Sequence, residues 1–215
     1  MRYILIPMFL LSHPFNNIYL KIAFYKISFG VVLVVFSQIF DLYIFEYLGY
    51  VEVLLGFIFF IYQLYLIFKT KVRKQKDIYY KYIVFSIINF IIALVLVCFY
   101  FVLSNDYLLF ISGFIFLLGF LTPIITAHLY KIIPFLVWFH RFSSLVGKQK
   151  VPMLADMVPV KSSDFGFAFY LLGFILSLIA FIFSSDILFK SAVSFLFVGT
   201  SFIVKDVFYI INFKG

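Results

Sequence analysis

Three histidines are the residues of this chain whose chemistry includes metal or haem ligation: His13, His128 and His140. Residues 3–13 (YILIPMFLLSH) align without a gap to residues 130–140 (YKIIPFLVWFH), so His13 and His140 occupy equivalent positions. Two imidazoles that face each other can ligate a b-type haem axially or share a metal ion. The alternative is that each histidine has a structural role, as an anchor or a hydrogen-bonded group at a helix end.

Glu52, Lys205 and Asp206 are ionisable residues inside long apolar segments. Such residues usually face the interior of a helical bundle in membrane proteins, where they can form part of a proton or ion path. The alternative is that their side chains lie near helix ends and extend toward water. No phosphate-binding glycine loop, nucleophile elbow or HExxH motif occurs, so the sequence does not predict catalytic activity.

The composition predicts which kind of secondary structure carries these residues. Of the 215 residues, 66% are hydrophobic and 12% are charged, and the mean hydropathy is +1.17. The apolar runs last ~20 residues, which is the length of a helix that crosses a hydrocarbon core. We therefore predict an all-α, polytopic transmembrane helical bundle. The net charge of +8 lies in short loops between the spans, so we predict no nucleic-acid partner.

We predict six full spans, preceded by a partial span in residues 1–18. The six predicted spans are residues 19–40, 47–68, 82–103, 107–127, 165–183 and 188–212. The loops 69–81 and 131–164 are rich in lysine and arginine, whereas the other joints are short and acidic. Because short basic loops stay in the cytoplasm, we expect both loops and the C-terminus on the cytoplasmic side of the inner membrane.

Residues 130–142 are predicted to form a separate helix at the membrane interface. Pro123 and Pro134 each remove a backbone donor and should kink the end of the preceding span. Aromatic and basic side chains suit the headgroup region, so four residues of this segment are expected to act as interfacial anchors. These anchors are Tyr130, Lys131, Trp138 and Arg141.

The sequence also predicts an internal repeat of two parallel halves. Besides the match at an offset of 127 residues, an offset of 145 aligns residues 23–25 with 168–170 and Asp41 with Asp186. The predicted parts are residues 1–81, a linking span in 82–106, and residues 107–215. On this prediction the chain begins within the first helix of its first half, and a complete unit would carry about one or two further spans.

Two motifs carry a resemblance to a known family. The stretch LYKIIPFLVWFHRF, followed by VPMLADMVP, and the stretch MRYILIPMFLLSHPF resemble uncharacterised bacterial multi-span proteins. Those proteins are distantly similar to the catalytic subunit of haem–copper oxidases, and the resemblance covers mainly residues 1–16 and 128–159. It implies a helical bundle with a relation to haem or copper handling. The oxidase subunit needs more histidines than the three present here, so a truncated or accessory member is expected.

These observations leave three hypotheses about function. The first is a non-catalytic or accessory component of a respiratory membrane complex. The second is a small transporter or channel built from parallel repeats. The third is a haem-binding redox subunit that uses His13, His128 or His140. The expected partners are the lipid bilayer and either other membrane subunits or a second copy of the chain.

Overall fold

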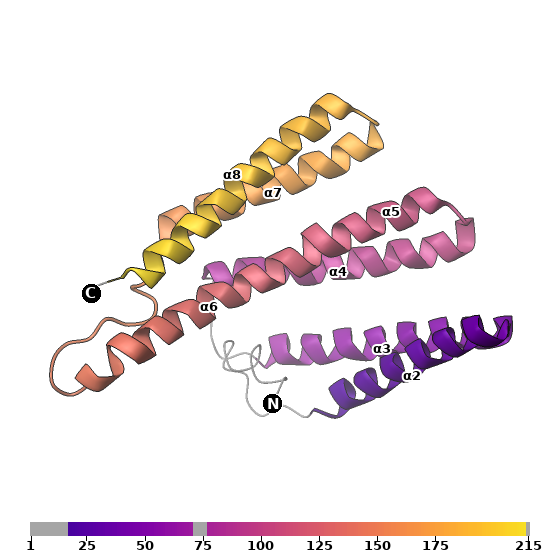
Figure 1. Cartoon of the computed structure of the whole chain (residues 1–215), viewed down its shortest axis with the longest axis horizontal. Helices are drawn as coiled ribbons and strands as arrows, with labels where there is room; N and C mark the ends of the chain where they lie inside the picture. The colour runs from indigo at the N-terminus through magenta and orange to yellow at the C-terminus, as the bar shows by residue number, and fades with distance from the viewer. Residues whose placement is uncertain (1–16, 71–76, 214–215) are drawn as a thin grey trace. The chain divides into compact units, whose positions relative to one another are not determined.

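The computed structural model describes residues 17–70 and 77–213, and every regular element within these ranges is helical. The chain divides into two compact units, Met1–Gln75 (unit 1) and Lys76–Gly215 (unit 2). Figure 1 shows the helices of both units. His13 and residues 1–16 of the predicted partial span lie outside the described residues.

Unit 1 contains an antiparallel hairpin of α2 (Ile18–Phe40) and α3 (Tyr43–Lys69). Small and polar residues recur at every seventh position of the two contacting faces, so the backbones can approach closely. A Cβ atom at Gly30 would lie 2.7 Å from the carbonyl oxygen of Gly49, so a larger residue does not fit there. The buried residues of this seam include Ala23, Gly30, Ser37, Gly49, Gly56 and Gln63.

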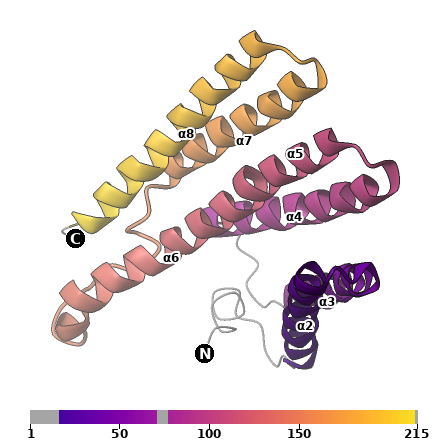
Figure 2. The same cartoon turned by 45° about the vertical axis from the view of Figure 1, so that its right-hand side comes forward.

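Unit 2 contains two further hairpins. Its main helical elements are α4 (Ile78–Leu103), α5 (Asp106–Phe114), the π-helical η1 (Ile115–Leu121), α6 (Thr122–Arg141), α7 (Val160–Ile182) and α8 (Asp186–Ile211). The second hairpin packs α4 against a continuous rod of α5, η1 and α6, and the third packs α7 against α8. Helix α4 contacts α7 and α6 contacts α8, so the two hairpins lie side by side (Figures 1 and 2). We call the end at which α4 and α7 begin the basic end.

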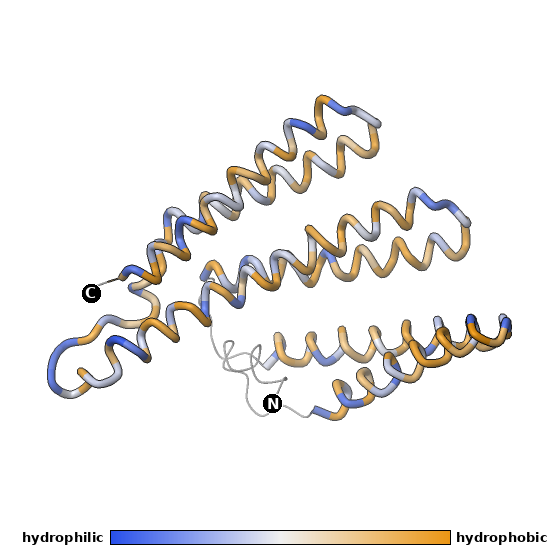
Figure 3. The backbone as a smooth tube through the Cα atoms, viewed as in Figure 1, coloured by the Kyte–Doolittle hydropathy of each residue, from blue (hydrophilic) through white to orange (hydrophobic). Residues whose placement is uncertain are grey.

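Six helices in the described part of the chain are long and apolar enough to cross a membrane. The predicted polytopic all-α fold is therefore confirmed, and the chain has the architecture of an integral membrane protein. Figure 3 shows hydrophobic residues along the helical shafts and more hydrophilic residues at the helix ends and in the connecting loops. Large apolar side chains stay exposed on the outer faces, as expected where the surrounding solvent is lipid.

The fourth span differs from its prediction. We expected a span over residues 107–127 and a separate interfacial helix over 130–142, but Asp106–Arg141 forms one rod of 36 residues. The helix continues through Pro123 because η1 changes the hydrogen-bond register: the backbone N–H of Thr122 donates to the carbonyl of Leu117, five residues back. At 1.5 Å per residue the rod is about 54 Å long, so part of it lies beyond a ~30 Å hydrocarbon core.

All three hairpins repeat one contact pattern. In the first hairpin a Cβ atom at Gly30 would meet the carbonyl of Gly49. In the third hairpin a Cβ atom at Gly173 would meet the carbonyl of Ala192. Both residues of the contact are shifted by 143 positions (30 to 173, 49 to 192). A shift of 63 (30 to 93, 56 to 119) relates the first seam to the second. The buried residues of the second seam are Ser86, Ala93, Ser112, Gly119 and Thr126.

The turns of the three hairpins agree as well. Each arm ends at a residue in the left-handed conformation, and the next helix begins two positions later. These turn residues are Asp41, Ser104 and Ser184, with φ of 53, 49 and 46°. The same turn and the same seam thus occur three times within the described residues.

Within the described residues the shared seam and turn relate three hairpins, and the expected division into residues 1–81, a linking span in 82–106 and residues 107–215 stays a prediction. Helix α4, which we expected to be the link, is one arm of the second hairpin. The contact pattern gives a shift of 143 between the first and third hairpins, whereas the offset of 145 expected from the sequence matches phenylalanines such as Phe24, Phe29 and Phe36. These side chains are 59, 56 and 42% exposed and point outward, whereas the small residues between the helices set the register. The match of residues 3–13 lies outside the described residues.

We expect Gly173→Val to destabilise unit 2, because a Cβ atom at this position would lie 2.6 Å from the backbone nitrogen of Leu196. Overpacking of this kind costs about 1–3 kcal/mol. Gly113→Val is the matched control, since a Cβ atom there meets nothing within 4 Å. Thermal unfolding of the detergent-solubilised protein should show a lower midpoint for Gly173→Val alone. Equal midpoints for the two variants would contradict the close seam.

Candidate functional site

Three buried side chains meet near the basic end of unit 2, and we call them the buried carboxyl cluster: Tyr82, Tyr130 and Asp206. The hydroxyl of Tyr130 donates a hydrogen bond of 2.8 Å to Oδ2 of Asp206. The rings of Tyr82 and Tyr130 stack with centroids 6.1 Å apart and an interplanar angle of 20°. The exposed fractions of Tyr82 and Asp206 are both 0%, and that of Tyr130 is 3%. The cluster therefore joins α4, α6 and α8.

The seam of the third hairpin explains why Asp206 points inward. Asp206 follows Gly199 by seven positions, as Gly199 follows Ala192, so it lies on the same buried face of α8. Gly199 packs against Gly166 of α7. Pro159, at the start of α7, lies seven positions before Gly166. Asp206 is therefore level with the N-terminus of α7. The unpaired N–H groups of a helix N-terminus carry a partial positive charge, which favours a nearby carboxylate.

The cluster holds polar atoms that have no hydrogen-bond partner among the described residues. These atoms are Oδ1 of Asp206 and the hydroxyl of Tyr82. A buried polar group without a partner is costly, and in native proteins it often accompanies a bound ion, a water molecule or a functional role. The unpartnered atoms therefore mark the buried carboxyl cluster as the candidate functional site of unit 2.

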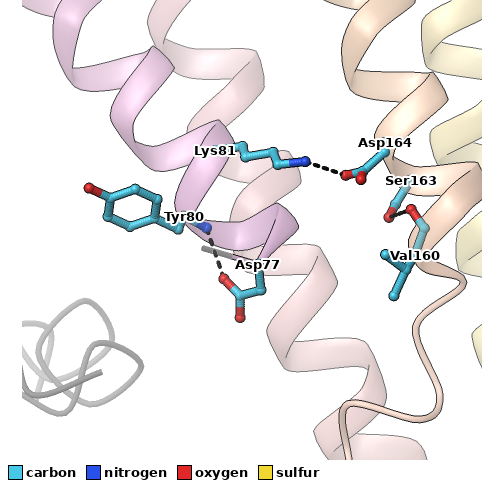
Figure 4. A network of polar contacts seen from close by, with 6 residues as sticks. All are labelled: Asp77, Tyr80, Lys81, Val160, Ser163 and Asp164. Atoms are coloured by element: carbon cyan, nitrogen blue, oxygen red, sulfur yellow. Dashed lines mark hydrogen bonds and ion pairs between the residues drawn. The ribbon is translucent and has the colours of Figure 1, made fainter. Parts of the chain in front are cut away.

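Two ion pairs lie next to the cluster, on the side toward the basic end (Figure 4 shows the pair of Lys81 and Asp164). The ammonium of Lys131 lies 2.6 Å from Oδ2 of Asp77, whose other oxygen accepts a hydrogen bond from the backbone N–H of Tyr80. The ammonium of Lys81 lies 2.6 Å from Oδ1 of Asp164. The pairs tie α4 to α6 and α7, and their side chains are partly exposed. They neutralise four charges next to Tyr82 and Tyr130.

The intramembrane residues predicted from the sequence have different environments. Asp206 is buried and does not extend toward water, whereas the neighbouring Lys205 is exposed with its ammonium 5.5 Å from the ring centroid of Phe202. Glu52 belongs to unit 1, where it pairs with Lys26 at 2.8 Å. It is nine positions inside α3, which begins four residues earlier than predicted. Only Asp206 of these three predicted residues joins the cluster.

The four predicted anchors divide in a similar way. Tyr130 is buried against Asp206 and Tyr82, so it packs inside unit 2 where we expected an interfacial side chain. Lys131 takes part in the ion pair with Asp77. The indole N–H of Trp138 donates to the carbonyl of Pro152 at 2.9 Å, and Arg141 donates to the carbonyl of Phe213 at 2.7 Å. Trp138 and Arg141 therefore attach the end of α6 to the following loop and to the end of α8.

The two described histidines do not come together. His128 and His140 lie on one helix, α6, twelve positions apart, which corresponds to about 18 Å along its axis. The Nδ1 atom of His128 lies 2.7 Å from the carbonyl oxygen of Ile124, so this nitrogen carries the proton. His140 is exposed beside Phe139. These two imidazoles cannot flank one haem, and a haem or metal site that includes His13 stays a prediction.

Within the described residues no three histidine, cysteine, aspartate or glutamate side chains lie together in a group that could hold a metal ion.

The sequence did not predict Tyr82 as a site residue, nor the ion pair of Lys81 and Asp164. A tyrosine inside an apolar span is the only signal that could have indicated Tyr82. The ion pair joins residues 83 positions apart, and no local pattern reports such a contact.

The π-helical segment η1 has a specific hydrogen-bond partner. In the register of η1 the carbonyl of Leu118 would accept from the backbone nitrogen of residue 123, five positions later, but Pro123 has no N–H. The hydroxyl of Tyr170 donates to this carbonyl at 2.6 Å. Helix α7 thus supplies the donor that the proline removes, close to the ring of Tyr82, whose centroid is 6.5 Å from that of Tyr170.

Comparison with protein-family models, with curated proteins and with solved structures finds no match to this chain. The resemblance of residues 1–16 and 128–159 to relatives of haem–copper oxidases therefore stays a prediction from those motifs.

We expect Tyr170→Phe to lower the stability of unit 2 by about 1–3 kcal/mol, the cost of leaving a buried carbonyl without a donor. The measurement is the thermal unfolding midpoint in detergent, with Tyr209→Phe, at an exposed position, as the control. Adding Pro123→Ala to Tyr170→Phe should recover part of the loss, because alanine restores a backbone donor in the rod. If Tyr170→Phe unfolds at the wild-type temperature, Tyr170 is not the required donor.

Proposed function

We propose that this chain is a small proton transporter or channel of the inner membrane, in which the buried carboxyl cluster binds the transported proton. The observation that carries the proposal is the buried Asp206 carboxyl group, which has one oxygen bonded to Tyr130 and the other without a partner among the described residues. Ionisable groups held inside a membrane bundle commonly belong to proton or ion paths.

The geometry supports both protonation states of the carboxyl group. When Asp206 is ionised, the hydroxyl of Tyr130 and the N-terminus of α7 stabilise the charge. When Asp206 is protonated, Oδ1 can carry the proton, because no described group occupies that oxygen. A proton can therefore bind and leave without disrupting the bond to Tyr130.

Polar groups on either side of the cluster support a path. Lys81 and Lys131, each one position nearer to the basic end than Tyr82 and Tyr130, form partly exposed ion pairs that water can reach. Toward the other end, buried polar residues continue between the helices of unit 2. They are Ser86, Asn89, Ser112, Thr126 and Ser177. On the predicted topology the basic end faces the cytoplasm, with loops 69–81 and 131–164 and the C-terminus on that side.

A second candidate is a non-catalytic, accessory component of a respiratory membrane complex. The intramembrane ion pair of Lys26 and Glu52 is partly exposed, which favours a protein neighbour over lipid. The motif resemblance of residues 128–159 points in the same direction. Co-purification of respiratory subunits with the tagged chain from mildly solubilised membranes would favour this candidate.

Proton flux into proteoliposomes, driven by an imposed membrane potential and followed with an internal pH dye, tests the proposal. We expect flux above that of empty vesicles for the wild type and loss of this flux for Asp206→Asn, which keeps the size of the side chain but cannot exchange a proton. Lys205→Ala is the matched control, because Lys205 neighbours Asp206 but faces outward. It should retain the flux.

Tyr130→Phe removes the hydrogen bond to Asp206 and should reduce the rate while leaving some flux. Wild-type flux equal to that of empty vesicles, or full flux from Asp206→Asn, would reject the proposal. A flux of sodium or potassium that leaves the internal pH unchanged would mean that the transported ion is a larger cation and not a proton.

A further inference from the structure

Unit 1 holds an ion pair at membrane depth. The ammonium of Lys26 on α2 lies 2.8 Å from Oε2 of Glu52 on α3, and the two side chains are 30 and 27% exposed. Lys26 is eight positions inside α2, about 12 Å from its beginning along the helix axis. Glu52 is nine positions inside α3, about 14 Å from its beginning. Both charges therefore lie within the apolar part of the hairpin.

The hairpin fold itself does not require this ion pair. The equivalent positions of the third hairpin, 143 further along (26 to 169, 52 to 195), are Phe169 and Phe195. Their rings stack with centroids 6.0 Å apart and an interplanar angle of 21°. Since the seam and the turn of the two hairpins agree, two uncharged phenylalanines pack in the third hairpin at the positions that the ion pair occupies in the first. The packing of one arm on the other is therefore possible without an ion pair at these positions.

Leaving the pair facing lipid would be unfavourable. Removing two charges from water costs more than their attraction returns unless further polar contacts satisfy the remaining donors and acceptors. Among the described residues the ammonium of Lys26 contacts the carboxylate of Glu52. The exposed part of the pair therefore favours a polar neighbour outside the hairpin, because lipid chains offer neither donors nor acceptors.

The ion pair places one positive and one negative group side by side, so its surface is complementary to the same surface of a second copy. In an assembly with two-fold symmetry the same patch occurs on both copies, so Lys26 of one copy can approach Glu52 of the other, and the reverse. Four alternating charges would then satisfy one another inside the membrane. Apolar side chains near the pair, among them Phe29, Leu48 and Leu55, are exposed and can pack in the same contact.

We propose that two copies of this chain associate in the membrane through the face of the α2–α3 hairpin that carries Lys26 and Glu52. This interaction surface does not depend on the proposed proton site, which lies in unit 2. Polar contacts between membrane helices contribute about 1 kcal/mol each or somewhat more, so several of them together with apolar packing are needed for a stable pair.

The test measures energy transfer between two populations of the full-length chain, labelled with donor and acceptor dyes and reconstituted at low density in lipid vesicles. Wild-type protein should show transfer. Lys26→Phe with Glu52→Phe, which copies the third hairpin, should lose the transfer and keep its thermal unfolding midpoint. The double exchange Lys26→Glu with Glu52→Lys restores both charges in reversed places and should keep the transfer.

The single variants separate this proposal from a merely structural role. Lys26→Glu places two acids in each copy, and Glu52→Lys places two bases, so each variant alone should show little transfer. A mixture of the two variants should regain it, because opposite charges then meet across the contact. No transfer in the wild type, or none in the mixture while both single variants unfold at the wild-type temperature, would overturn the proposal. Co-purification of a different membrane subunit with a single copy would overturn it too.

Discussion

Hydrocarbon supplies no hydrogen-bond partner, and this constraint accounts for most of the polar contacts in the chain. The hydroxyl of Tyr170 replaces the donor that Pro123 lacks, so the rod can continue through η1. Serine and threonine hydroxyls bond to carbonyls of their own helices, as Ser86 does to Ile83. The few polar atoms without a partner among the described residues are therefore informative, and two of them, Oδ1 of Asp206 and the hydroxyl of Tyr82, belong to the buried carboxyl cluster.

The three seams show how one scaffold carries different chemistry. Small residues at every seventh position bring two helices into backbone contact, and this contact fixes the register of each hairpin. Positions beside the seam can then vary freely: an ion pair in the first hairpin corresponds to two stacked phenylalanines in the third. Gln63, Thr126 and Asp206 occupy equivalent positions of the three seams. Only the third of these is ionisable.

Hydropathy alone was sufficient to predict the six spans, because hydrocarbon thickness and apolar run length are directly related. It could not predict the repeat register, since the frequent phenylalanines face lipid and match by chance at many offsets. The residues of the site were harder still. Tyr130 was interpreted from its neighbours Lys131 and Trp138, but its environment depends on Asp206, which is 76 positions away. The ion pairs of Lys81 and Lys131 span 83 and 54 positions, and only the packed structure brings them together.

The left-handed turns at Asp41, Ser104 and Ser184 have a consequence for the order in which the protein assembles. Each turn is short, so the two arms of a hairpin are neighbours along the chain and can pack soon after the second arm is synthesised. Contacts between neighbours in sequence form fastest, so α2 and α3 can pair while α4 is still being synthesised. The three described hairpins can therefore form one after another, and each helix packs against its neighbour in sequence before the next hairpin is synthesised.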